Sequence, residues 1–427
     1  MSIKKNKRMQ EHSQGFFVIM LLFSTALNSS IGEISIDYSR AGKDTAVMIY
    51  FDNGSTSHPK APGVAKSVHD VLEQGCFNIN RGGYAGAYTM SSLVFETREK
   101  LASFFDCPTG RNVIFTGGAT HSINLALKGL LKPGDHVVTT QMDHNAVFRP
   151  LKQLEKQGVI VDVAACYCDG RLNLSDMEAK ITSSTRLVVM THASNVCGAI
   201  LPIREVGSIC RKHGVLLVAD SAQTAGVLPI SMRDDNVDLL AFAGHKGLLA
   251  AGGVGGLIVS QEIADQITPL IAGGTGSHSH EADMPPELPD RLEAGTLNLP
   301  GIVSLSVALD YISATGTETI YATEKALLAR LTDGISDIPG VRMVGPGNLS
   351  DKCAVAALDF PNMDNAIVAA QLDEEFGIMT RCGLHCAPEA HKALGTFPSG
   401  VVRCSLGHRN TEAEIDVLLS ALRTIVV

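Results

Sequence analysis

Apolar strand-like segments alternate with helix-like segments along the middle of the chain, and this restricts the fold more than any other feature. The apolar runs lie at residues 112–115, 136–140, 159–164, 187–191 and 215–219. Segments with helical spacing of apolar residues lie between them, at 122–131, 146–157, 174–181 and 204–213. Strands that alternate with helices predict an α/β fold with a mainly parallel sheet covered by helices on both faces.

The length, composition and net charge of the chain indicate which kinds of ligand it can bind. The 427 residues are enough for two domains, and 45% hydrophobic with 19% charged residues is a globular composition. The formal net charge is −9 and the body of the chain has no basic run, so we expect a small-molecule ligand and no nucleic acid. Ten dispersed cysteines do not form the pattern of a disulfide framework, and they fit reduced thiols in a cytoplasmic protein.

The N-terminus differs from the rest of the chain. Basic residues between Lys4 and Arg8 precede an apolar run, Phe16–Leu27, which resembles a signal peptide and is short for a membrane span. The alternatives are a non-native extension ahead of a start at Met48, which we favour, and a membrane tether. We expect an extension at 1–47, a segment at 48–62 that packs with the small domain, a large domain at 63–300 and a small α+β domain at 301–427. One long helical stretch is expected at 302–335.

Polar residues follow the predicted strands, at the edge of the sheet where ligands bind in such folds. Asp220 ends an apolar run, and Lys246 follows the next one at 237–242, ahead of a glycine-rich turn at 252–256. A lysine held there is partly desolvated, which lowers its pKa and makes its amine a nucleophile. Thr116 to His121 joins a strand directly to a helix, an arrangement that binds anions at the helix N-terminus.

One chemistry uses all of these groups together. A lysine that forms a Schiff base, a carboxylate that pairs with a pyridinium nitrogen, a helix N-terminus for a phosphate and an aromatic ring to stack are the requirements of pyridoxal 5'-phosphate (PLP). Lys246, Asp220 and Thr120 supply the first three in that order. We therefore expect PLP in the large domain.

The same residues resemble a known family. The segments 219–223 and 244–247 are similar to those of the class V aminotransferases among fold-type I PLP enzymes, and specifically to cysteine desulfurases. The resemblance extends from about Met48 to the C-terminus and includes 50–53, 116–120, 143–147, 291–298, 383–388 and 403–406. It implies a large domain with a mainly parallel seven-stranded sheet and a smaller α+β C-terminal domain that carries a catalytic cysteine loop.

The resemblance also implies roles around the cofactor. Lys246 would bind PLP covalently, Asp220 would pair with its ring nitrogen and His144 would stack on the ring. The phosphate would be held by Ala119, Thr120 and His245, and by Thr275 of the partner subunit in a homodimer. Gln223 and Asn195 would contact the ring oxygen or the substrate side, and Arg403 would clamp the substrate carboxylate.

Cys386 distinguishes between the reactions of the family. A thiolate in this loop could take sulfur from L-cysteine, leaving L-alanine and a persulfide for a sulfur-acceptor protein. Cys382 is a weaker candidate, and selenocysteine lyase or another class V aminotransferase or β-lyase is the alternative activity. Cys382 and Cys386 have no second pair at metal spacing, so we expect no metal.

Two departures from the family pattern stand out. Ala243 occupies a position where a Ser or Thr hydroxyl usually meets the phosphate, so we expect one contact fewer, worth about 1.5–3 kcal/mol. Residues Tyr84–Ala87 look like a short insertion in the glycine-rich loop after Arg81.

Overall fold

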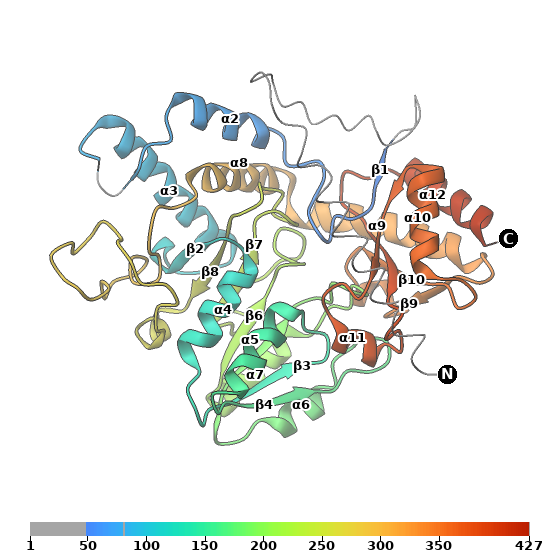
Figure 1. Cartoon of the computed structure of the whole chain (residues 1–427), viewed down its shortest axis with the longest axis horizontal. Coiled ribbons are helices and arrows are strands. Elements are labelled where there is room, and N and C mark those ends of the chain that lie inside the picture. Colours follow the sequence, from blue (N-terminus) through green and yellow to red (C-terminus); the bar gives the residue numbers. More distant parts are fainter. Residues whose placement is uncertain (1–47, 80–81, 427) are drawn as a thin grey trace, which may run out of the picture. The chain divides into compact units, whose positions relative to one another are not determined.

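The computed structural model describes residues 48–79 and 82–426 (Figure 1). The expectations for residues 1–47, and for Asn80 and Arg81 in the glycine-rich loop, lie outside the described residues. Within the described range, no helix taken singly has the length and hydropathy of a membrane span. Helices α8 (Leu299–Thr315) and α9 (Thr317–Ser336) meet that criterion only as a pair, which is bent by 77°.

A seven-stranded sheet forms the centre of the fold, in the order β2-β8-β7-β6-β5-β3-β4 (Figure 1). Strand β8 is antiparallel to both of its neighbours, and the other adjacent pairs are parallel. The predicted α/β class with a mainly parallel seven-stranded sheet is confirmed. The strands are β2 (Val113–Thr116), β3 (His136–Thr140), β4 (Ile160–Ala164), β5 (Thr185–Thr191), β6 (Leu216–Asp220), β7 (Leu239–Ala243) and β8 (Gly255–Val259).

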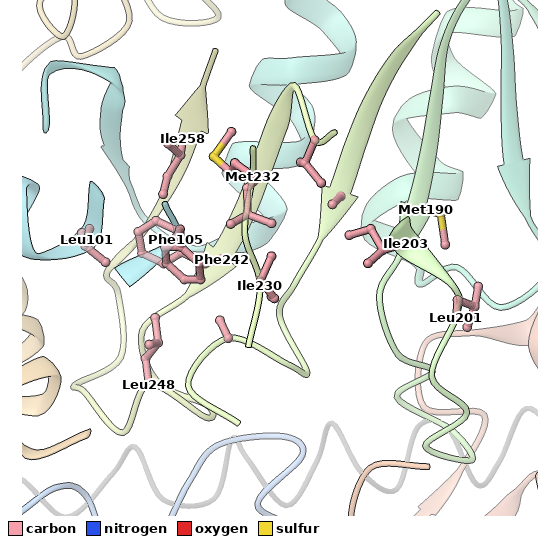
Figure 2. Close-up of a cluster of buried hydrophobic side chains, with 14 of the residues drawn as sticks. Leu101, Phe105, Met190, Leu201, Ile203, Ile230, Met232, Phe242, Leu248 and Ile258 are labelled. Atoms are coloured by element: carbon pink, nitrogen blue, oxygen red, sulfur yellow. The ribbon is translucent and has the colours of Figure 1, made fainter. Parts of the chain in front are cut away.

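Alternation along each strand sends side chains into two separate cores. In β7, Leu239 and Ala241 belong to one hydrophobic cluster, whereas Leu240 and Phe242 belong to the other. Figure 2 shows the second cluster, where the rings of Phe105 and Phe242 stack with centroids 5.8 Å apart. Because both faces are buried, these strands read as continuous apolar runs.

Helices supply the rest of both cores. The first cluster contains side chains of α4 (Ala119–Leu130) and α5 (Asn145–Glu155). The second contains side chains of α3 (Ala85–Phe104), α7 (Ile203–His213) and α8. Two further α-helices lie before residue 220 in the described part of the chain, α2 (Val64–Gln74) and α6 (Leu174–Lys180).

The C-terminal part is built on a four-stranded antiparallel sheet, in the order β12-β13-β10-β9. Its helices α9, α10 (Asn365–Phe376) and α12 (Glu412–Ile425) share one hydrophobic cluster with it. Strand β1 (Ile49–Tyr50) pairs with β11 (Ile378–Met379), which joins the start of the described chain to this part. The remaining elements are β9 (Arg342–Val344), β10 (Val355–Asp359), β12 (Arg381–Gly383), α11 (Pro388–Ala393) and β13 (Val401–Ser405).

Three local expectations were wrong. The single helical stretch at 302–335 is two helices that meet at Gly316, whose positive φ of 85° ends α8. Gly255 and Gly256 belong to strand β8 and not to the preceding turn. Ala85 to Ala87 form the first turn of α3 and do not belong to the loop after Arg81, whereas an insertion relative to the family at Tyr84–Ala87 stays a prediction. The division at residues 300 and 301 stays a prediction, although α8 packs its apolar side chains into the core of the large sheet.

Candidate active site

A cavity of about 510 Å³ opens beyond the carboxyl ends of the parallel strands. It collects side chains from β6 and β7, from the N-termini of α4 and α5, and from the loop after β5. Of the predicted site residues, the cavity brings together Ala119, Thr120, His144, Asn195, Asp220, Gln223, His245 and Lys246. Thr275, Arg403 and Cys386 do not line it.

Lys246 lies in the turn that follows β7, and its carbonyl accepts a hydrogen bond of 2.8 Å from the Leu249 amide. Burial lowers the pKa of its amine, and the charge of Asp220 partly restores it. The positive charges of Arg403 and Arg381 lower that pKa further. Lowering the pKa of a lysine enlarges the unprotonated fraction of its amine, which is the form that attacks an aldehyde.

Asp220 is the last residue of β6 and is 4% exposed. Its Oδ1 accepts a hydrogen bond of 2.9 Å from the Ala222 amide. Burial raises the pKa of the carboxyl, while the Ala222 amide and the charge of Lys246 lower it. A buried carboxyl with one amide donor is poorly compensated, so a cationic ring nitrogen in the cavity would be a favourable partner.

His144 caps the N-terminus of α5. Its Nδ1 accepts a hydrogen bond of 3.0 Å from the Ala146 amide, so the neutral ring carries its proton on Nε2. Burial, followed by the charge of Lys246, lowers the pKa of His144 to about 4. The imidazole is therefore uncharged at neutral pH and presents a flat aromatic surface that lines the cavity.

The turn before α4 forms an open cradle. Gly118, at φ 140°, turns the chain so that Ala119 and Thr120 begin the helix at the cavity. A Cβ on Gly255 would lie 2.6 Å from Gly118 Cα, so only glycine allows β8 to approach this turn. The exposed amides of a twelve-residue helix and the Thr120 hydroxyl fit a phosphate.

The floor of the cradle is made of three alanines. Ala119, Ala222 and Ala243 contact one another and are buried. Ala243 lines the cavity without a hydroxyl, as the sequence indicates. His245 also lines the cavity, and burial lowers the pKa of its ring to about 4, with the charges of Lys246 and Lys60 adding to that effect. Together, the cradle, the buried carboxyl and the lysine fit PLP.

Arg403 lies at the centre of β13 and is 1% exposed. Its Nη1 donates to the Asn195 carbonyl at 2.9 Å. Its Nη2 donates to Asp52 Oδ1 at 2.5 Å and to Ser55 Oγ at 2.8 Å. Its Nε is buried and has no hydrogen-bond partner among the described residues. The guanidinium expected to clamp a carboxylate is therefore already paired with one from the protein.

The Cys386 loop borders the site through backbone contacts. The Cys386 carbonyl accepts a hydrogen bond of 2.7 Å from the Asn145 amide, the residue next to His144. Asn195 Nδ2 donates to the His385 carbonyl, also at 2.7 Å. His385 and Cys386 both have positive φ, 50° and 56°, and the Cys386 side chain is exposed. The loop backbone is therefore held by two hydrogen bonds, while the Cys386 side chain remains accessible to solvent.

Gln223 lies at the cavity, whereas Thr275 does not. Gln223 lines the cavity, and its Nε2 donates to the Gly54 carbonyl at 3.0 Å. Thr275 is buried in the loop after β8, where its Oγ1 lies 3.1 Å from Ser277 Oγ. Its expected contact with the phosphate of a partner subunit stays a prediction.

Several residues of the site were missed in the sequence. Asp52, Ser55 and Arg381 surround Arg403, and Arg381 is its direct partner across β12 and β13. His121 and Ala222 line the cavity. The segment Tyr50 to Asn53 was singled out for its family resemblance, with no role given to Asp52, and nothing local in it indicates a partner 351 residues away. Among the described residues, no group of three His, Cys, Asp or Glu side chains is placed to hold a metal ion.

Comparisons with known proteins agree with this geometry. The model of the aminotransferase class-V family matches residues 49–418. A probable cysteine desulfurase from Methanothermobacter thermautotrophicus is 32% identical, over 88% of this chain and 94% of its own length. The apo structure of a cysteine desulfurase from Thermococcus onnurineus has a TM-score of 0.83 and 31% identity, with 89% of this chain and 94% of that chain covered. A cysteine desulfurase structure from Escherichia coli has a TM-score of 0.81 and 25% identity, with 89% and 94% covered. The chain therefore belongs to the class V aminotransferase family.

Proposed function

We propose that this protein is a PLP-dependent cysteine desulfurase. It converts L-cysteine to L-alanine and leaves the sulfur as a persulfide on Cys386. The observation that carries the proposal is the position of the Cys386 loop. Its backbone is bound to Asn145, beside His144, and to Asn195, and both His144 and Asn195 line the cavity that contains Lys246. The similarity to cysteine desulfurases over most of the chain supports it.

The residues present would hold the cofactor in a defined way. Lys246 would bind it covalently, Asp220 would pair with its ring nitrogen, and His144 would cover one face of the ring. Ala119, Thr120 and His245 would hold its phosphate. When bound, PLP supplies an electron sink for the carbanion of an amino acid.

Other side chains would act on L-cysteine itself. Arg403 and Asn195 would orient the carboxylate, so that the sulfur faces the Cys386 loop. The Cys386 thiolate would form a bond to that sulfur as the Cβ–S bond breaks. One cysteine and one enzyme thiol give one alanine and one enzyme persulfide, so atoms and electrons balance without an external oxidant. A sulfur-acceptor protein would then take the outer sulfur.

The experiment is incubation of the PLP-loaded protein with L-cysteine. We expect one alanine per sulfur released, and mass spectrometry should locate a persulfide on Cys386. Cys386→Ala should abolish both products. Cys382→Ala is the matched control, because that half-buried thiol lies in β12 of the same region. Unchanged turnover in Cys386→Ala would contradict the proposal.

We also propose a homodimer in the cytoplasm, with Thr275 reaching the phosphate in the partner subunit. Thr275 does not line its own cavity, while Leu270 of the same loop lines it and is 37% exposed. Its neighbour Ile271 is 53% exposed, which suits burial by a second subunit. The ten cysteines are all unpaired, as a reducing compartment requires. Light scattering should give a dimeric mass. Mixing Lys246→Ala with Thr275→Ala subunits should recover activity only if the sites are shared.

A further inference from the structure

The carboxylate of Asp52 is bound to Arg403, the residue that would bind the carboxylate of a substrate. Ser55 Oγ lies within hydrogen-bond distance of three groups, because it accepts from Arg403 Nη2 at 2.8 Å and from Arg381 Nη1 at 2.7 Å and donates to Asp52 at 2.8 Å. Asp52 in turn accepts from the same Nη2. Two guanidinium groups and one carboxylate therefore converge on a single hydroxyl.

Because of the geometry of a guanidinium, the hydrogen bonds from Arg403 to Asp52 and Ser55 limit how a second carboxylate can bind to Arg403. A carboxylate can form two parallel bonds with arginine along the Nε and Nη2 edge, or along the Nη1 and Nη2 edge. Both edges include Nη2. The two hydrogens of Arg403 Nη2 are directed to Asp52 and Ser55, so neither two-bond arrangement is open. An incoming carboxylate must displace one of these two partners.

Asp52 is the partner that can leave. Its side chain is 22% exposed, so its carboxylate has access to water, whereas Arg403 is 1% exposed and fixed by the Asn195 carbonyl. Exchange of one carboxylate for another also leaves the local charge unchanged. Displacement of Ser55 instead would bring two carboxylates together at one buried cation.

We propose that Asp52 is a specificity-determining residue, an internal carboxylate that occupies Arg403 until a carboxylate-bearing substrate replaces it. The proposal rests on the function proposed above, in which Arg403 receives the carboxylate of L-cysteine. Asp52 keeps the buried guanidinium oriented and paired in the free enzyme. It also opposes binding, because every carboxylate ligand must compete with it.

The test compares ligands with and without a carboxylate. In Asp52→Asn, the neutral amide competes less well for Arg403, so KM for L-cysteine should fall about tenfold. The dissociation constant of L-alanine for the PLP-loaded enzyme, followed by the change in visible absorbance, should fall by a similar factor. The dissociation constant of cysteamine, which lacks a carboxylate, should stay within about twofold of wild type.

Two further variants make the result decisive. Asp416→Asn breaks an aspartate–arginine pair on the surface, at Arg330, and should change none of these constants. Ser55→Ala removes the hydroxyl that supports Asp52, so it should shift L-alanine binding in the same direction by a smaller factor. A rise in the L-alanine dissociation constant in Asp52→Asn, or equal shifts for L-alanine and cysteamine, would overturn the proposal. If the wild type does not desulfurate L-cysteine, the proposed function fails, and the L-alanine to cysteamine ratio still decides the role of Asp52.

Discussion

Glu324 should make the stability of the protein depend on pH. This carboxyl lies in α9, is 7% exposed, and accepts one hydrogen bond, of 3.2 Å, from the His408 amide. It faces a small cavity of about 50 Å³ that Lys246, His58 and His408 also line. Burial raises the pKa of Glu324 from 4.5 to about 8, and the His408 amide offsets only part of this effect.

The direction of the effect follows from proton linkage. Between pH 4.5 and about 8 the folded state keeps a proton that the unfolded state has released. The contribution to stability is therefore fully present below pH 4.5 and is lost as the pH rises through about 8. At about 1.4 kcal/mol per pH unit, the difference between the folded and unfolded pKa values limits this contribution to stability to about 5 kcal/mol. Water in the small cavity would reduce it.

Glu324→Gln replaces the protonated carboxyl with a neutral group of the same shape. We expect the variant and the wild type to have similar free energies of unfolding at pH 5. At pH 9 the variant should be more stable by about 2–5 kcal/mol, because it has no proton to lose. Urea denaturation followed by circular dichroism at pH 5, 7 and 9 measures this difference.

The other titratable groups of the small cavity are shared by both proteins, so their contributions cancel in the comparison. Glu374→Gln, an exposed glutamate of α10, is the control and should give no difference that grows with pH. Parallel pH profiles for Glu324→Gln and the wild type would refute the reasoning, and so would a variant that is less stable at pH 9.

Ala243→Ser should add the missing hydroxyl at the floor of the phosphate cradle and lower the PLP dissociation constant about tenfold, measured by titration of the apoprotein. Unchanged or weaker binding would show that the cradle has no room for the hydroxyl. Arg98→Met should lower the free energy of unfolding by about 3–5 kcal/mol in urea, because it removes bonds of 2.6 and 2.8 Å and leaves the buried carboxylate of Glu293 without a cation. Arg330→Met, at a surface ion pair, should lower it by less than about 1 kcal/mol, and equal losses would contradict the role of burial.

The parts of the site that follow strands could be predicted from the sequence. Asp220 and Lys246 come directly after apolar runs, and a buried parallel sheet converts such runs into strands whose carboxyl ends meet at one edge. Thr120 and His144 begin helices after strands, which places them at the same edge. These positions depend on the hydrophobic pattern and the order of elements along the chain, and both can be read from a single sequence.

The parts that depend on distant pairing could not be predicted. Asp52 and Arg403 meet because β1 and β13 belong to the same region of the fold, although 351 residues separate them. The start of α3 was missed because Gly86 lowers helix propensity, and packing of the helix against the sheet and α8 outweighs that loss. The bend after α8 depends on one glycine whose φ cannot be read from apolar spacing.

The hydrogen bond between the Asn145 amide and the Cys386 carbonyl has a consequence for how the loop moves. Any movement of the loop away from the cavity edge breaks this bond. The amide proton of Asn145 can exchange with solvent deuterium only while the bond is broken. This single backbone proton therefore records how often the cysteine loop opens, and it does so whether or not sulfur is transferred.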